Sequence, residues 1–163
     1  MNEAVIFDFD GTLIHLPIDY GQMFAEFREI MQVDNVQPVT EVVSKLDENT
    51  RQQVFRVWDK AELAAATNVT IKREGMEIYK RFSIKPKALV TMQGEAVVKK
   101  ILAHLGLSFD VAVTREYSLN RAQQLESTAE KLEIELVNIL FVGDTENDAL
   151  AAKKVGCKFL RVR

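Results

Sequence analysis

Residues 4–14 read AVIFDFDGTLI, in which a short apolar run is followed by two acids, a glycine and a threonine. A short, wholly apolar run that ends in a turn is typical of a strand buried on both faces of a parallel sheet. Two carboxylates at its end repel each other and resist desolvation unless a cation lies between them. The stretch therefore predicts a buried strand over 4–7, followed either by an ordinary acidic turn or by a functional site.

Residues 137–148 repeat this pattern near the other end of the sequence, where they read VNILFVGDTEND. In an open α/β sheet, ligands bind beyond the carboxyl ends of the strands, so two strands with acidic ends can share one site. Four carboxylates are then expected to converge, those of Asp8, Asp10, Asp144 and Asp148. Because these are hard oxygen ligands with no cysteine or histidine beside them, they favour Mg²⁺ over zinc or copper.

Strand and helix patterns alternate from residue 88 onward. Strands are expected over 88–90, 109–113, 139–142 and 159–162, separated by helices over 94–105, 122–132 and around 150–152. Five strands that alternate with helices indicate a parallel sheet covered on both faces. The predicted fold class is therefore α/β, with a Rossmann-like, doubly wound, parallel five-stranded sheet.

Residues 15–86 carry helical patterns without a clear strand between them. Apolar residues recur there at helical spacing, as at Phe24, Phe27 and Ile30. We interpret this region as an α-helical cap inserted after the first strand. The predicted domains are a Rossmann-like catalytic core of residues 1–14 and 87–163 and a cap of residues 15–86.

The composition excludes several classes of protein. The chain has 163 residues, a net charge of −3 and a single cysteine, so it lacks the basic character of a nucleic-acid binder and contains no internal disulfide. It has no apolar run of 18 residues, and its first residues are acidic and strand-like rather than a basic segment leading into an apolar one. We therefore expect a cytoplasmic protein with no nucleic-acid or membrane partner, and the sequence leaves the oligomeric state open.

Three of these segments resemble the conserved motifs of a known superfamily. Asp8-Phe9-Asp10-Gly11-Thr12, Thr91 after an apolar strand, and Gly143-Asp144 with Asp148 are similar to motifs I, II and IV of the haloacid dehalogenase (HAD)-like phosphohydrolases. The match spans almost the whole chain in the right order. Within that superfamily the chain resembles phosphoglycolate-phosphatase-like phosphatases, which carry a small helical cap of type C1 after the first strand.

The resemblance implies a covalent phosphatase mechanism. Asp8 is then the nucleophile that forms an aspartyl-phosphate, and Asp10 protonates the leaving oxygen and later activates water. Dehalogenases that attack carbon lack the second acid because a halide needs no proton, so Asp10 favours phosphate esters. The metal ligands implied for Mg²⁺ are Asp8, Asp10, Asp144 and Asp148.

Phosphate oxygens are expected to bind at two further segments. Thr91 and Gln93, with the main-chain N–H groups at Gly94, precede a predicted helix whose positive end favours anions. Thr12, after Gly11, is a second hydroxyl donor. Each threonine is equally interpreted as a helix cap or turn hydroxyl, and both interpretations stay open.

The third family motif, which supplies a Lys or Arg, departs most from the superfamily pattern. No Lys-Pro pair occurs between residues 114 and 134, where Arg121 near a helix start is the best-placed cation and Arg115 the second. An Arg side chain is not geometrically equivalent to Lys. We predict that Arg121 acts with Asp8 and Asp10 in catalysis and also binds phosphate.

The segment 72–87 has six basic side chains and two acidic ones. Such a segment either binds the remote anionic part of a substrate or forms a solvated helix face. The sequence does not decide between the two.

The predicted function is that of a Mg²⁺-dependent phosphatase acting on a small phosphorylated metabolite, with phosphoglycolate as a candidate substrate. No nucleotide-binding glycine motif, serine elbow or zincin helix occurs to support another mechanism. Two alternatives stay open. One is a phosphomutase or phosphonatase on the same scaffold, and the other is a regulatory domain that binds phosphate or metal with little turnover.

Overall fold

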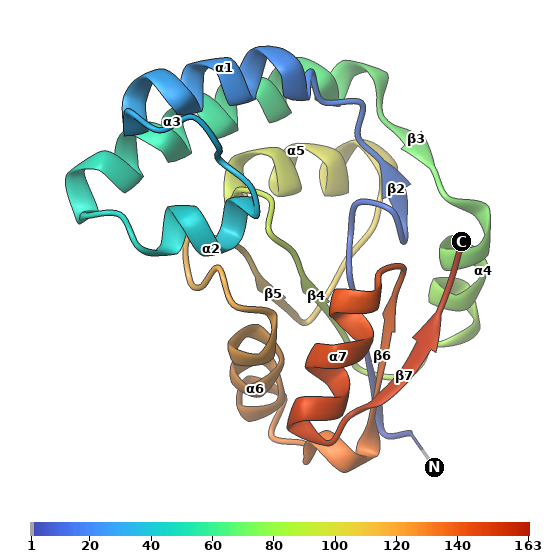
Figure 1. Cartoon of the computed structure of the whole chain (residues 1–163). Coiled ribbons are helices and arrows are strands. Elements are labelled where there is room, and N and C mark those ends of the chain that lie inside the picture. The colour runs from blue at the N-terminus through green and yellow to red at the C-terminus, as the bar shows by residue number, and fades with distance from the viewer. Residues whose placement is uncertain (1) are drawn as a thin grey trace.

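The computed structural model describes residues 2–163 (Figure 1). Within these residues, five parallel strands form one sheet in the order β5-β4-β1-β6-β7. Their bounds are β1 Ala4–Phe7, β4 Lys87–Val90, β5 Val111–Val113, β6 Ile139–Gly143 and β7 Lys158–Arg161. The predicted doubly wound α/β fold is confirmed.

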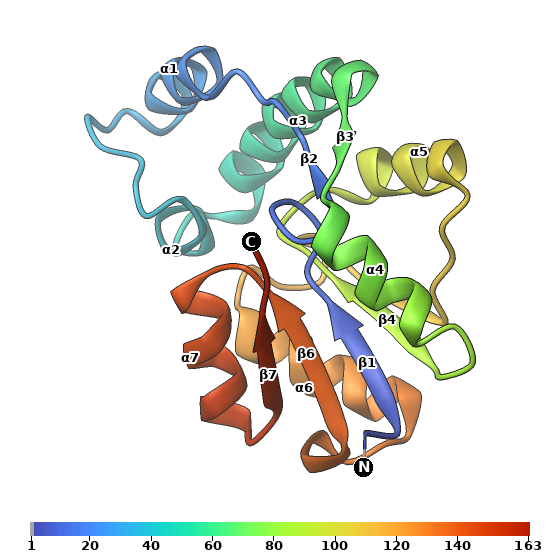
Figure 2. The same ribbon diagram turned by 90° about the vertical axis from the view of Figure 1, so that its right-hand side faces the viewer.

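Strand β1 is the central strand of the sheet, and every residue in it is fully buried. Its side chains alternate between the two faces. Val5 and Phe7 pack in one apolar cluster with α4 (Arg73–Arg81) and α5 (Glu95–Leu105). Ala4 and Ile6 pack in another with α6 (Arg121–Leu132) and α7 (Glu146–Val155). In Figure 2, α4 crosses in front of the sheet and α6 lies behind it.

The register of the sheet brings three strand ends to one edge. Phe7, the last residue of β1, pairs with Leu89 of β4 and with Val142 of β6. Parallel strands end at the same edge of a sheet, so the residues that follow β1, β4 and β6 lie close together. This register places the acids at positions 8 and 144 side by side.

Three helices form the main part of the insert and have an apolar core of their own. They are α1 (Tyr20–Met31), α2 (Val39–Ser44) and α3 (Glu48–Ala65), and a 3₁₀ turn, η1 (Ala66–Asn68), follows α3. Buried apolar side chains from all three helices form a separate cluster, which includes Phe27, Val43 and Trp58. In Figure 1 these helices lie beyond the carboxyl edge of the sheet.

A short antiparallel ribbon connects the insert to the core. Strand β2 (Ile14–His15) pairs with β3 (Thr70–Ile71), although no strand was predicted between 15 and 86. Two residues per strand are too few to produce a visible alternation in the sequence. The next helix, α4, packs on the sheet, where the Tyr79 ring centroid lies 6.0 Å from that of Phe7. The predicted domain boundaries at 15 and 86 stay a prediction.

The remaining element is η2 (Leu136–Asn138), a 3₁₀ turn that leads into β6. Strand β5 begins at Val111, two residues later than expected, and β7 begins at Lys158, one residue earlier. None of the helices within residues 2–163 combines the length and the apolar character needed to cross a membrane.

Candidate active site

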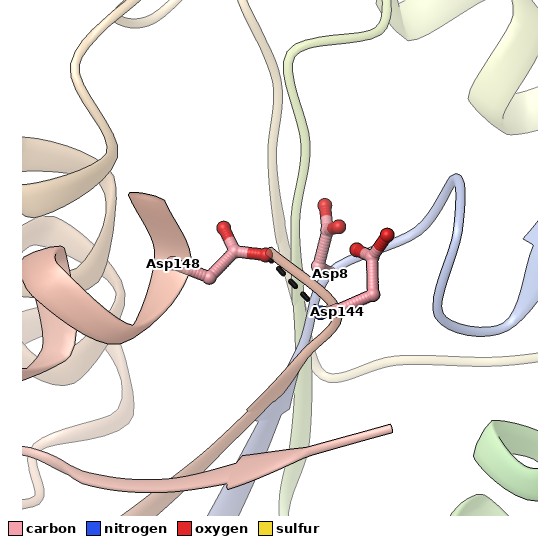
Figure 3. A group of neighbouring side chains, drawn as sticks. All are labelled: Asp8, Asp144 and Asp148. Carbon is pink, nitrogen blue, oxygen red and sulfur yellow. Dashed lines mark hydrogen bonds between the residues drawn. The ribbon is translucent and has the colours of Figure 1, made fainter. Parts of the chain in front are cut away.

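Three aspartates from different elements meet at the carboxyl edge of the sheet. Asp8 follows β1, Asp144 follows β6 and Asp148 lies in the first turn of α7, and one carboxylate oxygen of each lies within 4.8 Å of the others. Figure 3 shows the Asp8 and Asp144 carboxylates side by side, with that of Asp148 directed toward them. Asp8 and Asp148 are buried, and Asp144 is partly exposed. Like charges held this close favour either a cation among them or a raised pKa at one carboxyl.

The local structure fixes each carboxylate. The Asp8 N–H donates to the Val142 carbonyl at 2.9 Å, which extends the β1–β6 pairing by one residue. Asp148 forms a capping box with Thr145: the Thr145 hydroxyl accepts from the Asp148 N–H at 3.1 Å, and Asp148 Oδ2 accepts from the Thr145 N–H at 3.4 Å. The capping box therefore anchors the first turn of α7 and orients Asp148.

Arg121, at the start of α6, lies against two of the three aspartates. Its Nη2 donates to Asp8 Oδ1 at 3.0 Å and its Nε to Asp148 Oδ1 at 3.1 Å. The side chain is 8 % exposed. The planar guanidinium donates to the two carboxylates from separate nitrogens held at fixed positions, a geometry that the single nitrogen of a lysine does not reproduce. The cation predicted from the sequence thus lies where it can offset charge on Asp8.

Gln124 is a further residue of the site that the sequence did not reveal. Its Oε1 accepts from Arg121 Nη1 at 2.6 Å, and its Nε2 donates to the Thr91 carbonyl at 2.9 Å. It is fully buried, one helical turn beyond Arg121. The sequence did hold one signal for Gln124, because it is a polar side chain on the same helix face as the buried Leu125. Gln124 connects Arg121 to the segment after β4.

The loop after β1 folds back over Asp144. Thr12 Oγ1 lies 3.2 Å from Asp144 Oδ1 and 3.4 Å from Asp8 Oδ2, so its hydroxyl can donate a hydrogen bond to either carboxylate. Gly11 has a positive φ of 88°, and a Cβ at this residue would collide with the Asp144 carboxylate. Only glycine combines this backbone conformation with such close contact.

Asp10 lies apart from the other three acids. Its Oδ1 accepts from the Leu16 N–H at 2.9 Å, and it is not in the group of carboxylates whose oxygens converge among residues 2–163. Burial raises the pKa of Asp10, and the hydrogen bond from Leu16 opposes this. A raised pKa suits a general acid better than a metal ligand.

The loop between β4 and α5, residues 91–94, lies beside the aspartates. The Thr91 hydroxyl accepts from the Gln93 N–H and donates to Gln93 Oε1, both at 3.1 Å. The buried Gln93 Nε2 has no hydrogen-bond partner among residues 2–163. This amide is therefore an unsatisfied buried donor. The Gly94 N–H, expected to face phosphate, donates instead to Glu62 Oε1 of α3 at 3.1 Å.

Arg115, the second cation considered from the sequence, lies away from the aspartates. It is fully buried and pairs with Glu62 and Asp59 of α3. In the basic segment, Lys87 Nζ donates to the Phe82 and Ser83 carbonyls at the end of α4, and Arg73 pairs with Glu77 on the surface. Lys72 lines a cavity of about 570 Å³ together with Gly11, Asp144 and Arg161.

The electrostatics of Asp8 favour a bound cation. Burial raises the pKa of its carboxyl well above the usual range; the Arg121 guanidinium opposes this shift, and the charges of Asp148 and Asp144 add to it. The donor set is carboxylate oxygen only, as Mg²⁺ prefers. The residues present thus fit a Mg²⁺ ion held chiefly by Asp8 and Asp144. Both Asp148 oxygens already accept hydrogen bonds, from Arg121 and from the N–H groups of Asp144 and Thr145.

Comparison with known proteins identifies a family. A family model described as haloacid dehalogenase-like hydrolase matches residues 3–156. The phosphoglycolate phosphatase of Neisseria meningitidis is 27% identical, over 95% of this chain and 77% of its own length. The Neisseria gonorrhoeae phosphoglycolate phosphatase matches with the same identity and coverage.

Solved structures show the same fold. A haloacid dehalogenase-like family protein from Streptococcus pneumoniae superposes with a TM-score of 0.71 at 16% identity, over 99% of this chain and 85% of its own. CbbY from Rhodobacter sphaeroides, solved in complex with phosphate, has a TM-score of 0.72 at 16% identity, with coverage of 98% and 85%.

Proposed function

Because this chain belongs to the haloacid dehalogenase-like hydrolase family, we propose that it is a Mg²⁺-dependent phosphatase that hydrolyses a small phosphate monoester. The observation that carries the proposal is the contact of Arg121 with both Asp8 and Asp148, at the point where three carboxylates meet. A nucleophile, an offsetting cation and a metal-binding oxygen set lie together there. These are the parts that phosphoryl transfer requires.

In the proposed first step, an Asp8 oxygen attacks phosphorus and the bond from phosphorus to the leaving oxygen breaks. Asp10, whose pKa is raised by burial, gives its proton to that oxygen. The product alcohol leaves, and an aspartyl-phosphate remains on Asp8.

In the second step, Asp10 takes a proton from water, and the resulting nucleophile attacks phosphorus. Inorganic phosphate leaves and Asp8 is regenerated. A bound Mg²⁺ supplies positive charge beside the nucleophile and the phosphate. Thr91 and Gln93 hold phosphate oxygens from one side and Arg121 from the other, whereas Asp148 positions Arg121.

For the substrate, we propose a monoester with a second anionic group, such as phosphoglycolate. Lys72 lines the cavity beside Asp144 and offers positive charge to a carboxylate near this metal-binding edge, whereas Arg161, which also lines it, already pairs with Glu146. The similarity to phosphoglycolate phosphatases of Neisseria supports the same choice.

Phosphate release tests the proposal. With Mg²⁺ present, the chain is expected to release phosphate from phosphoglycolate and, more slowly, from an aryl phosphate that lacks a carboxylate. Asp8→Asn is expected to abolish both activities while leaving the fold intact. Absence of turnover above the Asp8→Asn background across a broad panel of monoesters would contradict the proposal and favour a binding or regulatory domain.

The same assay separates the phosphatase from its nearest alternatives. A phosphomutase retains the phosphoryl group in an organic product, and a phosphonatase cleaves a carbon–phosphorus bond. Phosphorus NMR of the reaction mixture distinguishes inorganic phosphate from both outcomes.

A further inference from the structure

One face of α3 carries four side chains that all contact Arg115 of the core. Phe55, Trp58, Asp59 and Glu62 recur at helical spacing, so they share that face. The Arg115 guanidinium carbon lies 4.4 Å from the ring centroid of Trp58 and 5.3 Å from that of Phe55. Its Nη1 donates to Glu62 Oε1 at 2.8 Å, and its Nη2 pairs with Asp59. The insert thus encloses a core arginine.

Arg115 of the core and Glu62 of the insert also both bind the β4–α5 loop. Arg115 Nη1 donates to the Met92 carbonyl at 3.2 Å, and the Arg115 N–H donates to the Gln93 carbonyl at 3.3 Å. From the insert, Glu62 Oε1 accepts from the Gly94 N–H at 3.1 Å. The ion-paired side chains therefore bind Met92 and Gly94, and the main chain of Arg115 binds Gln93 between them.

Gly94 shows how close the insert approaches. A Cβ at this residue would collide with the Asp59 carboxylate and would lie 2.7 Å from Arg115 Nη2. The backbone of the loop is in direct contact with the ion pair. Any larger residue would force the ends of the Asp59 and Arg115 side chains to move.

The ion pair between Glu62 and Arg115 is poorly suited to stabilising the fold alone. Glu62 Oε2 and Arg115 Nε are buried without a hydrogen-bond partner among residues 2–163. Partly satisfied buried charges contribute little net stability, because desolvation offsets their attraction. An apolar contact would hold the two parts together equally well. What the charged pair adds is direct hydrogen bonding to the backbone of the loop.

We infer that Glu62 and Arg115 are positioning residues through which the helical insert sets the conformation of the β4–α5 loop, and so its affinity for phosphate. The inference rests on the proposed function, in which Thr91 and Gln93 of that loop hold phosphate oxygens. Displacing α3 from the core releases the Gly94 N–H and also removes the Glu62 carboxylate that holds Arg115 Nη1, the group that donates to the Met92 carbonyl. The contact between insert and core is thereby coupled to the binding of phosphate.

The first test measures inhibition by inorganic phosphate during aryl phosphate hydrolysis. Glu62→Ala is expected to raise the phosphate Ki about tenfold, with a smaller effect on kcat. Glu62→Gln, whose amide oxygen still accepts from the Gly94 N–H, is expected to recover most of the affinity. The matched control is Val54→Ala, since Val54 is a buried residue of the same helix that packs in the insert's own cluster. It is expected to leave the Ki within twofold of wild type.

The second test does not require turnover. The Gln93 N–H bonds to the Thr91 hydroxyl and does not touch Glu62, so its hydrogen exchange reports loop order. In the absence of phosphate, residue-resolved hydrogen exchange is expected to be faster at the Gln93 N–H in Glu62→Ala than in Val54→Ala.

The outcomes separate the two proposals. An inactive wild-type protein whose Gln93 exchange rises in Glu62→Ala alone contradicts the phosphatase and supports the positioning role. An active protein whose phosphate Ki and Gln93 exchange are the same in Glu62→Ala and Val54→Ala overturns the positioning role. Failure of Glu62→Gln to recover affinity also counts against it.

Discussion

Arg121 holds two of the three clustered aspartates through separate nitrogens of one planar group. This geometry supports the proposed role of Arg121 as the cation of the third family motif. The Gln124 amide, which accepts from the third nitrogen, leaves the guanidinium little freedom to rotate. At the scale of single residues, the site therefore depends on the shape of the guanidinium as well as on its charge.

Replacement of Arg121 tests this dependence. Arg121→Ala is expected to lower kcat by about 10²–10³, the usual effect of removing one preorganised charge-stabilising donor. Arg121→Lys keeps the charge but not the two-carboxylate bridge, so an intermediate loss is expected. The control is Arg51→Lys on the exposed start of α3, which is expected to keep wild-type kcat. Equal activity of Arg121→Lys and wild type would show that charge alone matters.

Helix starts position the functional side chains at the scale of elements. The Thr145 hydroxyl caps α7 and fixes Asp148, and the Asn120 side chain accepts from the Gln123 N–H to cap α6, next to Arg121. Capping groups satisfy N–H groups that the helix leaves free. The capping hydrogen bonds at the starts of α6 and α7 therefore also help to hold Arg121 and Asp148 in position for their ion pair.

Removing the N-cap of α7 and, as a control, that of α3 distinguishes an effect on stability from an effect on catalysis. Thr145→Ala is expected to lower the free energy of unfolding by about 0.5–2 kcal/mol and also to lower kcat, because the first turn of α7, which carries Asp148, loses its anchor. Asp47→Ala removes the cap of α3, far along that helix from Glu62, and is expected to cost similar stability with unchanged kcat. Urea titration and steady-state kinetics measure the two quantities. Unchanged kcat in both variants would argue against the orienting role of the Thr145 cap.

The three clustered carboxylates link segments that are distant in the chain, so their repulsion acts on the whole molecule. Asp8 and Asp144 directly follow β1 and β6, which are neighbouring strands of the core sheet. A cation that binds only the folded arrangement stabilises the fold by mass action.

Mg²⁺ is therefore expected to raise the Tm. At a concentration of about 100 Kd the stabilisation is about 2.7 kcal/mol, and a chain of this size shifts by roughly 2–4 °C per kcal/mol. Asp144→Asn is expected to remove the shift. Glu146→Gln, an exposed acid two residues away and outside the cluster, is expected to keep it. A shift that persists in Asp144→Asn would place the ion elsewhere.

The contact between insert and core also makes stability depend on pH. Burial raises the pKa of Glu62 to about 7, with Arg115 and the Gly94 N–H opposing and Asp59 adding to the shift. The folded chain then binds this proton more tightly than the unfolded chain does. The stabilisation is present below about pH 4.5, the ordinary range of a glutamate, and is lost as the pH rises through about 7.

Comparison with Glu62→Gln isolates this effect from other groups. Asp59, Arg115 and Tyr20, which face Glu62, are unchanged in the variant. Between pH 5 and 8, the free energy of unfolding of the wild type is expected to fall relative to Glu62→Gln by on the order of 1–3 kcal/mol, since one pKa unit is about 1.4 kcal/mol. Parallel stability curves for the two proteins would contradict the raised pKa.

The sequence by itself determined the fold class, the family and three of the four acids predicted to converge, Asp10 being the exception. Apolar runs that end in Asp8 and Asp144 carry this information locally, because a strand buried on both faces has a distinctive pattern and the residues after it must lie at the edge of the sheet. The helical insert was predicted in the same way, from spacing within each helix.

Only the tertiary structure decided which polar groups meet. It placed Arg121 rather than Arg115 beside Asp8, separated Asp10 from the acid cluster, paired the Gly94 N–H with Glu62 and revealed Gln124 and the β2–β3 ribbon. The physical reason is that an ion pair or hydrogen bond depends on positions within a few ångströms. Those positions follow from how distant segments pack, and no local periodicity in the chain records them.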